Sequence, residues 1–332
     1  MEDTKSEKLS TVFDGLIQDY ESLHSSLNEI YNESQNIRIL SFNSSIEAAR
    51  AGTVGKGFRV IANEIKNISE KNDTQNQTCQ KVVDQIEIKM HKLIGIRTAE
   101  MAFDTIDKVD RNLFERYCDV QAWATFGKII DCLANPTEEK RISAEHTIES
   151  LVRIYEVYHD ILLTDTSGIV VCVGVNKNLR GRSMQNTKWF KETSESQSTT
   201  YSDMYYSESV KDWTVSYSCP VRAQDGTIVG IISTRFNWKF ILNIISSAKV
   251  SHSGEIFIIN NDGLVIASKN KDEILKRRLT DWEAFEHISQ GQKMGFYTNK
   301  TSRALEVFGY SKTPGYNSYK GKEWSVVIKE NY

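Results

Sequence analysis

Apolar residues in the first third of the chain recur at alternating steps of four and three, with polar residues between them. One such stripe, interrupted by Ser34, consists of Phe13, Leu16, Tyr20, Leu23, Leu27, Ile30 and Ile37. A second consists of Phe58, Ile61, Ile65 and Ile68, and it resumes at Cys79, Val82, Ile86, Met90 and Leu93. This spacing is the a/d heptad pattern of a coiled coil. It predicts two long helices, joined by a glycine-rich turn at 52–57 into an antiparallel hairpin.

Each helix of this hairpin, which we place at residues 1–96, keeps an apolar seam that its partner helix leaves uncovered. Because two isolated helices bury little surface, we expect a second copy of the chain to complete a homodimeric four-helix bundle. A monomeric helical pair is the alternative. The second helix is expected to continue from residue 95 to about 135, and a shorter helix to run from 144 to 157.

The hydrophobic pattern changes to strands in the C-terminal half. Two similar strand-turn-strand units, 160–173 and 254–268, each pass through a turn that ends in glycine, Gly168 or Gly263. A third turn at Gly226 closes the first unit, and apolar runs near residues 308 and 324 end the second. Such turns between apolar runs are hairpin signals. The sequence therefore predicts an α+β fold, in which a long helix carries two antiparallel-sheet lobes.

Charge and composition narrow the class of partner and the location. A net charge of -3 favours neither nucleic acid nor an acidic lipid surface as the main partner. The five cysteines are spread singly, which argues against a disulfide framework or a structural zinc site, so we expect reduced thiols. The most apolar stretch, 227–245, is interrupted by polar residues, and the N-terminus lacks a signal-like apolar run. We therefore expect no membrane span and a soluble, cytoplasmic protein.

The segment 36–70 contains the ordered runs IEAARAG, GKGF and VIANEIK. It resembles the signalling tip of methyl-accepting chemotaxis proteins, with the tip near residues 43–64. In that family the tip binds the coupling protein CheW and the kinase CheA, and it packs receptor dimers into trimers of dimers. The resemblance implies that the contact residues for the kinase and coupling protein are Ile39, Asn43, Glu47, Arg50, Phe58, Val60 and Ile61. The plainer reading of Glu47 and Arg50 is an ion pair along one helix face.

The segment 97–332 resembles the double Cache ligand-binding module, whose two lobes are PAS-like. The matching pieces, in chain order, are Leu113–Tyr117, Tyr158–Gly168, Trp189-Phe190, Cys219–Val221, Gly226 with Gly230, Gly254–Ile259 and Gly315–Trp324. The resemblance implies a helical stalk at 97–157, a first, ligand-binding lobe at 158–248 and a second lobe at 249–332.

In this family the ligand usually sits in the first lobe, whose segment here is rich in rings with polar edges and in charged groups. The residues expected to bind the ligand are Arg182, Thr187, Trp189, Phe190, Tyr201, Asp203, Tyr205, Trp213, Tyr217, Arg235 and Asn237. The plainer readings are that Trp189 belongs to the core and that Arg235 is a surface charge. Ligand closure of this lobe is expected to shift the helix 58–135 and so change the activity of a kinase bound at the tip.

The amino-acid-sensing subset of the family has an arginine two positions before the tryptophan and an aspartate near the strand that ends the lobe. Here Thr187 and, approximately, Arg235 stand at those places. This departure from the pattern makes an amino acid bound in the usual way unexpected. A basic residue in the lobe instead favours a carboxylate, or a purine- or pyrimidine-like molecule, because a guanidinium forms paired hydrogen bonds with such groups.

Two other classes of function compete with a receptor. A haem- or other cofactor-binding PAS-like sensor without kinase coupling would use His159, the one histidine that lies near a strand in an attractive position. An enzyme would need a nucleophile or metal motif, and neither Asp203 nor Asp212 has a fixed partner in the sequence. We expect no enzymatic activity, no cofactor and no metal.

Overall fold

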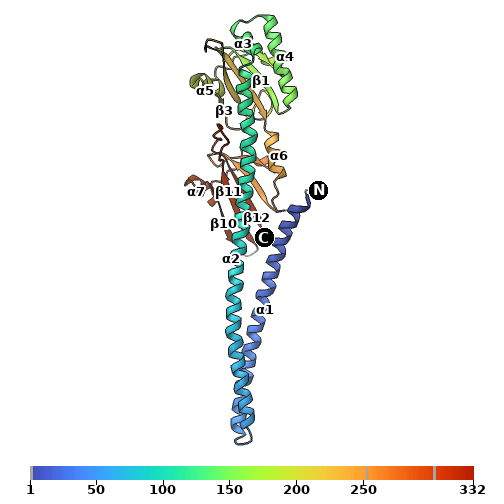
Figure 1. Cartoon of the computed structure of the whole chain (residues 1–332), viewed down its shortest axis with the longest axis vertical. Helices are drawn as coiled ribbons and strands as arrows, with labels where there is room; N and C mark the ends of the chain where they lie inside the picture. Colours follow the sequence, from blue (N-terminus) through green and yellow to red (C-terminus); the bar gives the residue numbers. More distant parts are fainter. Residues whose placement is uncertain (1–2, 252, 302–303) are drawn as a thin grey trace. The chain divides into compact units, whose positions relative to one another are not determined.

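The computed structural model describes residues 3–251, 253–301 and 304–332 (Figure 1). Its helices are α1 (Asp3–Arg50), α2 (Lys56–Ala124), α3 (Gly127–Ala134), α4 (Glu138–Tyr155), η1 (Lys177–Leu179), α5 (Lys188–Ser196), α6 (Lys239–Ser247), η2 (Lys271–Glu273) and α7 (Glu283–Ser289). Its strands are β1 (Tyr158–Thr164), β2 (Val170–Val173), β3 (Thr200–Tyr201), β4 (Tyr205–Ser207), β5 (Asp212–Val215), β6 (Tyr217–Arg222), β7 (Ile228–Asn237), β8 (Glu255–Ile259), β9 (Val265–Ser268), β10 (Met294–Lys300), β11 (Leu305–Lys312) and β12 (Ser325–Asn331).

The chain divides into two compact units. Unit 1 comprises Met1–Arg97, Thr298–Val307 and Asn331–Tyr332, and unit 2 comprises Thr98–Tyr297 and Phe308–Glu330. Among the helices of the described ranges, none is long and apolar enough to cross a membrane.

Unit 1 is dominated by the predicted hairpin of α1 and the first part of α2. One position in each heptad is buried between the two helices, and several of these positions carry small or polar side chains. The Ser69 hydroxyl donates to the Ser34 carbonyl oxygen at 2.8 Å, and the Ser41 hydroxyl donates to the Ala62 carbonyl oxygen at 2.6 Å. The Asn76 side chain donates to the carbonyl oxygen of Leu27 at 2.8 Å. These bonds fix the register of the antiparallel pair.

The predicted apolar stripe is split by this packing. Phe13 and Leu27 are buried, whereas four positions of the same stripe stay 42–47% exposed: Leu16, Leu23, Ile30 and Ile37. The turn between the helices lies where the glycines predict it, and Gly52 has a φ of +62°, a conformation that glycine adopts without strain.

The long helix ends earlier than predicted. α2 stops at Ala124, because Phe126 takes an extended conformation (φ -69°, ψ 126°) and α3 starts anew at Gly127. The next helix, α4, begins at Glu138 rather than at 144. Thr137 caps it by accepting a hydrogen bond from the backbone N–H of Lys140, just beyond Pro136. The single helix expected to reach residue 135 is therefore interrupted.

Unit 2 contains two antiparallel sheets beside α2 (Figure 1). The first has strand order β2-β1-β7-β5-β4, with β6 between β7 and β3, and the second has order β10-β11-β12-β8-β9. The predicted strand-turn-strand units are β1–β2 and β8–β9, and each carries a register shift at the same place, after Leu163 and after Ile258. The expected α+β fold, long helices followed by antiparallel sheets, is confirmed.

The main core of unit 2 runs along α2 beneath both sheets. Ile106, Val109 and Leu113 of α2 are fully buried there. Because side chains alternate along a strand, Ile161 and Leu163 of β1 join this core while the residue between them points to the opposite face of the sheet. That opposite face holds the candidate site.

Candidate functional site

A cavity of about 370 Å³ lies in the first lobe, a volume typical of small-molecule sites. Its walls come from β1, η1, the loop before α5, α5 itself, the segment 202–209 and β7. The lining residues are Leu162, Leu179, Met184, Thr187, Lys188, Trp189, Ser202, Asp203, Met204, Tyr205, Tyr206, Ser207, Glu208, Ser209 and Arg235.

Arg235 is the buried charge of this cavity, with 3% of its surface exposed. Its Nη1 donates to the Ser233 hydroxyl and to the Thr234 carbonyl oxygen, both at 2.8 Å, and its guanidinium lies 4.9 Å from the centre of the Trp189 ring. Within the described ranges no carboxylate lies within ion-pair distance of it. A guanidinium has five N–H donors, so donors remain for a ligand. The surface-charge reading of Arg235 is wrong.

The nearest candidate counter-ion, Asp160, faces Arg235 across the β1–β7 pair but is engaged elsewhere. Its carboxylate accepts hydrogen bonds from the backbone N–H groups of Ile161, Val175 and Asn176 at 2.8–3.0 Å. Burial raises the pKa of Asp160, while these three N–H groups and Arg235 act in the opposite direction. Asp160 therefore serves to fix the turn that leads into η1.

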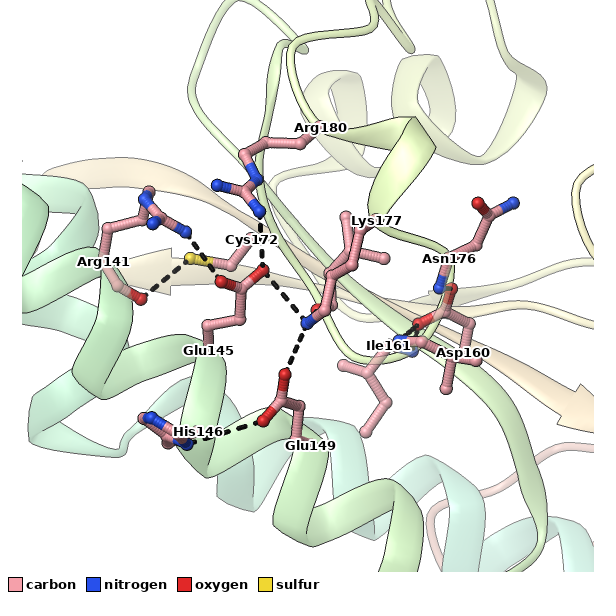
Figure 2. A network of polar contacts seen from close by, with 12 residues as sticks. Arg141, Glu145, His146, Glu149, Asp160, Ile161, Cys172, Asn176, Lys177 and Arg180 are labelled. Carbon is pink, nitrogen blue, oxygen red and sulfur yellow. Dashed lines mark hydrogen bonds and ion pairs between the residues drawn. The ribbon is translucent and has the colours of Figure 1, made fainter.

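An ion-pair network holds η1 from the other side (Figure 2). Glu145 of α4 pairs with Arg141 at 2.7 Å and with Lys177 at 3.1 Å, and Lys177 also pairs with Glu149 at 2.6 Å. Burial acts to raise the pKa of Glu145, but the hydrogen bonds from Arg141 and Lys177 outweigh it and hold that pKa below its ordinary value. The network places η1, and with it Leu179, at the cavity wall.

Asp203 links the cavity wall to the second lobe. Its Oδ1 accepts a hydrogen bond from the Trp324 indole at 2.8 Å, and its Oδ2 lies 3.5 Å from the side-chain nitrogen of Asn260. Nearby, the Tyr201 hydroxyl donates to the carbonyl oxygen of Gly321 at 3.1 Å. The segment 201–204 is thus tied to both lobes of unit 2.

Five of the predicted ligand residues line the cavity: Thr187, Trp189, Asp203, Tyr205 and Arg235. The other six do not. Arg182 is exposed on the loop, and Phe190 is buried in the small core behind Trp189. Tyr201, Trp213 and Tyr217 pack against the main core, and the Asn237 side chain accepts from the backbone N–H of Lys239 at the start of α6.

Sequence reasoning missed the apolar wall of the cavity. Leu162, Leu179, Met184 and Met204 line it, although they carry no polar group that would single them out. The alternation along β1 was the one available signal, because it places Leu162 on the face opposite Ile161 and Leu163. Nothing in the sequence marked the two methionines.

The residues assigned to the competing functions have ordinary surroundings. His159 is partly buried, and its Nε2 lies 3.7 Å from a carboxylate oxygen of Asp212. Burial lowers the pKa of His159, against the effect of Asp212. In the described part of the chain no group of three or more His, Cys, Asp or Glu side chains gathers to hold a metal. These observations give no support to a haem-binding sensor or to an enzyme.

The predicted tip residues lie around the turn of the hairpin in unit 1. Ile39, Phe58, Val60 and Ile61 are 57–71% exposed, which is high for apolar side chains. Asn43 is exposed as well. Arg50 and Glu47 lie 3.3 Å apart and form the ion pair of the plainer reading.

Comparison with known proteins identifies the ligand-binding part. The family model described as "Cache domain" matches residues 80–332. The ligand-binding domain of the Campylobacter jejuni chemoreceptor Tlp3, solved with 4-methylisoleucine, is 13% identical and matches 73% of this chain and 92% of its own, with a TM-score of 0.57. An extracellular ligand binding receptor from Desulfohalobium retbaense is 18% identical over 70% of this chain and 40% of its own, with a TM-score of 0.56. At these identities the likeness shows the fold.

Among curated proteins, the methyl-accepting chemotaxis protein CtpM of Pseudomonas aeruginosa is 35% identical over 77 residues. The match covers 23% of this chain and 14% of CtpM, so this chain spans a small part of that relative's length.

These comparisons correct the predicted cytoplasmic location. The matched Cache structures are ligand-binding domains of receptors, and the Desulfohalobium retbaense protein is described as extracellular, which points away from the cytoplasm. The prediction rested on the lack of an apolar span and of a signal-like run, and a folded lobe that binds a polar ligand has the same surface chemistry on either side of a membrane. Since the family model matches well over half of its residues, this chain belongs to the Cache domain family and carries a chemoreceptor-type ligand-binding domain.

Proposed function

We propose that this protein is a chemoreceptor-type sensor that binds a small carboxylate-bearing molecule in the first-lobe cavity, with Arg235 as its anchor. The observation that carries the proposal is a nearly fully buried guanidinium that lines a cavity of about 370 Å³ without an acidic partner in the described ranges. An unpaired buried charge is costly, and a ligand carboxylate would offset that cost through charge-assisted hydrogen bonds. The chain acts by binding and not by catalysis.

The walls favour a ligand with an apolar body. Leu162, Leu179, Met184 and Met204 surround the space beside the Trp189 ring. The Tlp3 domain was solved with an amino-acid derivative, 4-methylisoleucine, which weakens the sequence-based preference against amino acids, so α-amino acids belong among the candidate carboxylates. Two acidic residues, Asp203 and Glu208, also line the cavity, and Asp203 already accepts hydrogen bonds from the second lobe.

The proposal is tested by binding measurements on the wild-type chain and two arginine variants. Thermal-shift screening and calorimetry would compare short aliphatic and aromatic carboxylates, L-amino acids, purines and organic cations. We expect Arg235→Gln to weaken binding of the best carboxylate by roughly 100-fold, the effect of removing a charged hydrogen-bonding partner. Arg182→Gln is the matched control, since Arg182 lies outside the cavity, and it should bind as the wild type does. Tight binding of cations alone, or equal affinity in the Arg235 variant, would contradict the proposal.

The output side of the proposal rests on the hairpin. Its tip resembles the part of methyl-accepting chemotaxis proteins that binds CheA and CheW, and the exposed apolar residues Phe58 and Ile61 suit such a contact. The exposed stripe of Leu16, Leu23, Ile30 and Ile37 suits a second copy of the chain in a homodimeric four-helix bundle, which the family assembles into trimers of dimers.

In this proposal the ligand shifts a balance between packed states of α2, with a coupling of about 1–3 kcal/mol. The support is that α2 is one helix from Lys56 to Ala124, so residues of both units belong to it. Replacing Phe58 and Ile61 with serine should abolish control of the kinase and leave ligand affinity unchanged. If kinase control survives these substitutions, the tip is not the output site.

A further inference from the structure

A buried cysteine of α3 and a buried cysteine of the first sheet face each other. Cys132 lies on α3 and Cys172 on β2, both are fully buried, and their sulfur atoms are 3.7 Å apart. They are 40 positions apart in the sequence, so only the fold brings them together. The structure holds both as free thiols, as it does the other three, Cys79, Cys118 and Cys219.

Their surroundings make the two thiols unequal. The one S–H of Cys172 has two acceptors within reach, the carbonyl oxygen of Arg141 at 3.5 Å (Figure 2) and the sulfur of Cys132 at 3.7 Å. The hydrogen bond from Cys172 lowers the pKa of Cys132, and the nearby Arg141 guanidinium acts in the same direction against the effect of burial. The pKa of Cys172 is raised by the same bond and by its own burial. A thiolate is the nucleophile in disulfide exchange, so Cys132 is the better attacking group.

We propose that Cys132 and Cys172 form a reversible disulfide that fastens α3 to the first sheet. The oxidant is a disulfide of low molecular weight. The Cys132 thiolate attacks one of its sulfur atoms and releases one thiol, giving a mixed disulfide. The Cys172 thiolate then attacks the Cys132 sulfur and releases the second thiol. The protein loses two electrons and two protons, and the reagent gains both to become two thiols.

A bond between the two cysteines would restrain α3 against the first sheet, because of where the two residues lie. Cys172 points from β2 into the main core, while its neighbours Val170 and Val173 belong to the cluster beside the cavity. A bond here would hold α3 against the back of the sheet whose front carries the ligand cavity. It would also close a loop of about 40 residues in the unfolded chain, which stabilises the folded state.

The reagent reaches the pair when α3 lifts from the sheet. This helix has only eight residues, its N-terminus has no side-chain cap, and Pro136 follows two residues after its end. Short uncapped helices open more readily than long ones.

The test exposes the full chain to oxidised glutathione and counts thiols after denaturation. We expect peptide mapping to give a pair that contains Cys132 and Cys172, joined with loss of two hydrogen atoms, separately from any glutathione adduct of the exposed Cys79. The melting temperature of the oxidised protein should exceed that of the reduced protein by about 5–10 °C, and dithiothreitol should reverse this rise.

Cys132→Ser and Cys172→Ser should each abolish this peptide pair and the rise in melting temperature. Cys219→Ser, a buried cysteine of the same lobe, is the matched control and should keep both. Peptide mapping of the disulfide in the wild-type protein tests the proposal even if a serine variant folds poorly. Persistence of all five thiols in mild denaturant, formation of glutathione adducts only, or a bond between another pair would overturn the proposal.

Discussion

The two lobes of unit 2 share a strand scaffold but differ in what they enclose. In both, a backbone N–H after the turn donates to the turn glycine: Met184 to Gly168 at 2.7 Å, and Leu279 to Gly263 at 2.9 Å. Counting from these bonds, Thr187 of the first lobe corresponds to Trp282 of the second. Counting from the strand registers, Leu162 corresponds to Phe257. The first lobe has a cavity at these positions.

In the second lobe the same space is filled by rings. The Trp282 ring lies 5.8 Å from that of Phe257 and 5.1 Å from that of Phe308, both edge to face. The Arg277 guanidinium lies 4.9 Å from the centre of the Phe257 ring and 5.5 Å from that of the Trp282 ring. It also pairs with Glu273 at 2.5 Å. Arg277 of the second lobe is therefore paired with a carboxylate, whereas Arg235 of the first lobe has no carboxylate within ion-pair distance among the described residues.

The comparison indicates that side-chain size at these two positions distinguishes the lobe with a cavity from the lobe with a filled core. Aromatic side chains bury large areas and close a space of this size, whereas leucine and threonine leave it open. Conversely, a buried arginine without an acidic partner among the described residues retains a charge that a carboxylate ligand would offset. The scaffold is shared, and the two lobes differ in side-chain volume and in charge pairing.

The largest expected effect comes from giving the second lobe the residue of the first. Trp282→Thr removes a ring that packs on two others, and it should lower the free energy of unfolding of unit 2 by about 2–4 kcal/mol. Urea denaturation followed by circular dichroism measures this. Trp282→Phe keeps a ring and should cost about 1 kcal/mol. If Trp282→Thr lowered the free energy of unfolding by less than about 1 kcal/mol, the stability of the second lobe would not depend on the ring.

The reciprocal change, Thr187→Trp, should fill the first-lobe cavity. We expect the affinity for the best carboxylate to fall by roughly 100-fold or more, because overlap with the ligand has no compensating contact. Calorimetry measures the affinity. Thr187→Ser keeps the small side chain and its hydroxyl and serves as the control. Unchanged affinity in the tryptophan variant would place the ligand elsewhere.

The smallest expected effect is a pH dependence of stability. Each lobe is hydrogen-bonded to a different aspartate of α2, Asp119 for the first lobe and Asp110 for the second. Asp119 accepts from the Tyr158 hydroxyl at 2.6 Å and has Arg116 at 2.9 Å. Asp110 instead accepts from the Thr313 hydroxyl at 2.6 Å and from the Gly315 N–H at 2.9 Å. Burial raises the pKa of Asp110 from 3.8 to about 6.

At a pH between 3.8 and about 6, Asp110 keeps its proton in the folded state but has lost it in the unfolded state. The free energy of unfolding should therefore fall as the pH rises from about 4 to about 6, by about 1–3 kcal/mol, and change little above that. Asp110→Asn should remove this part of the pH dependence. Urea titrations across the range measure it, with Asp104→Asn, an exposed position on α2, as the control. Equal slopes in the wild type and the Asp110 variant would show that Asp110 is not the titrating group.

The helices, the sheets and their duplication could be predicted from the sequence because they follow local rules. Heptad spacing marked α1 and α2, and the turns at Gly168 and Gly263 marked the paired strands. The end of α2 at Ala124 was missed, since no proline or glycine cluster signals the extended conformation of Phe126.

The residues of the candidate site were predicted only in part, and there is a physical reason why the others were missed. Periodicity tells on which face of an element a side chain lies, but it does not tell which face a distant element will cover. Tyr201 and Tyr217 are rings of the right type that pack into the core, whereas Leu162 and Met204 line the cavity. The approach of Cys132 to Cys172 and the pairing of Arg277 but not Arg235 likewise depend on contacts between elements far apart in the chain. The sequence by itself determined which elements form and in what order, and tertiary packing alone decided which of their side chains enclose an empty space.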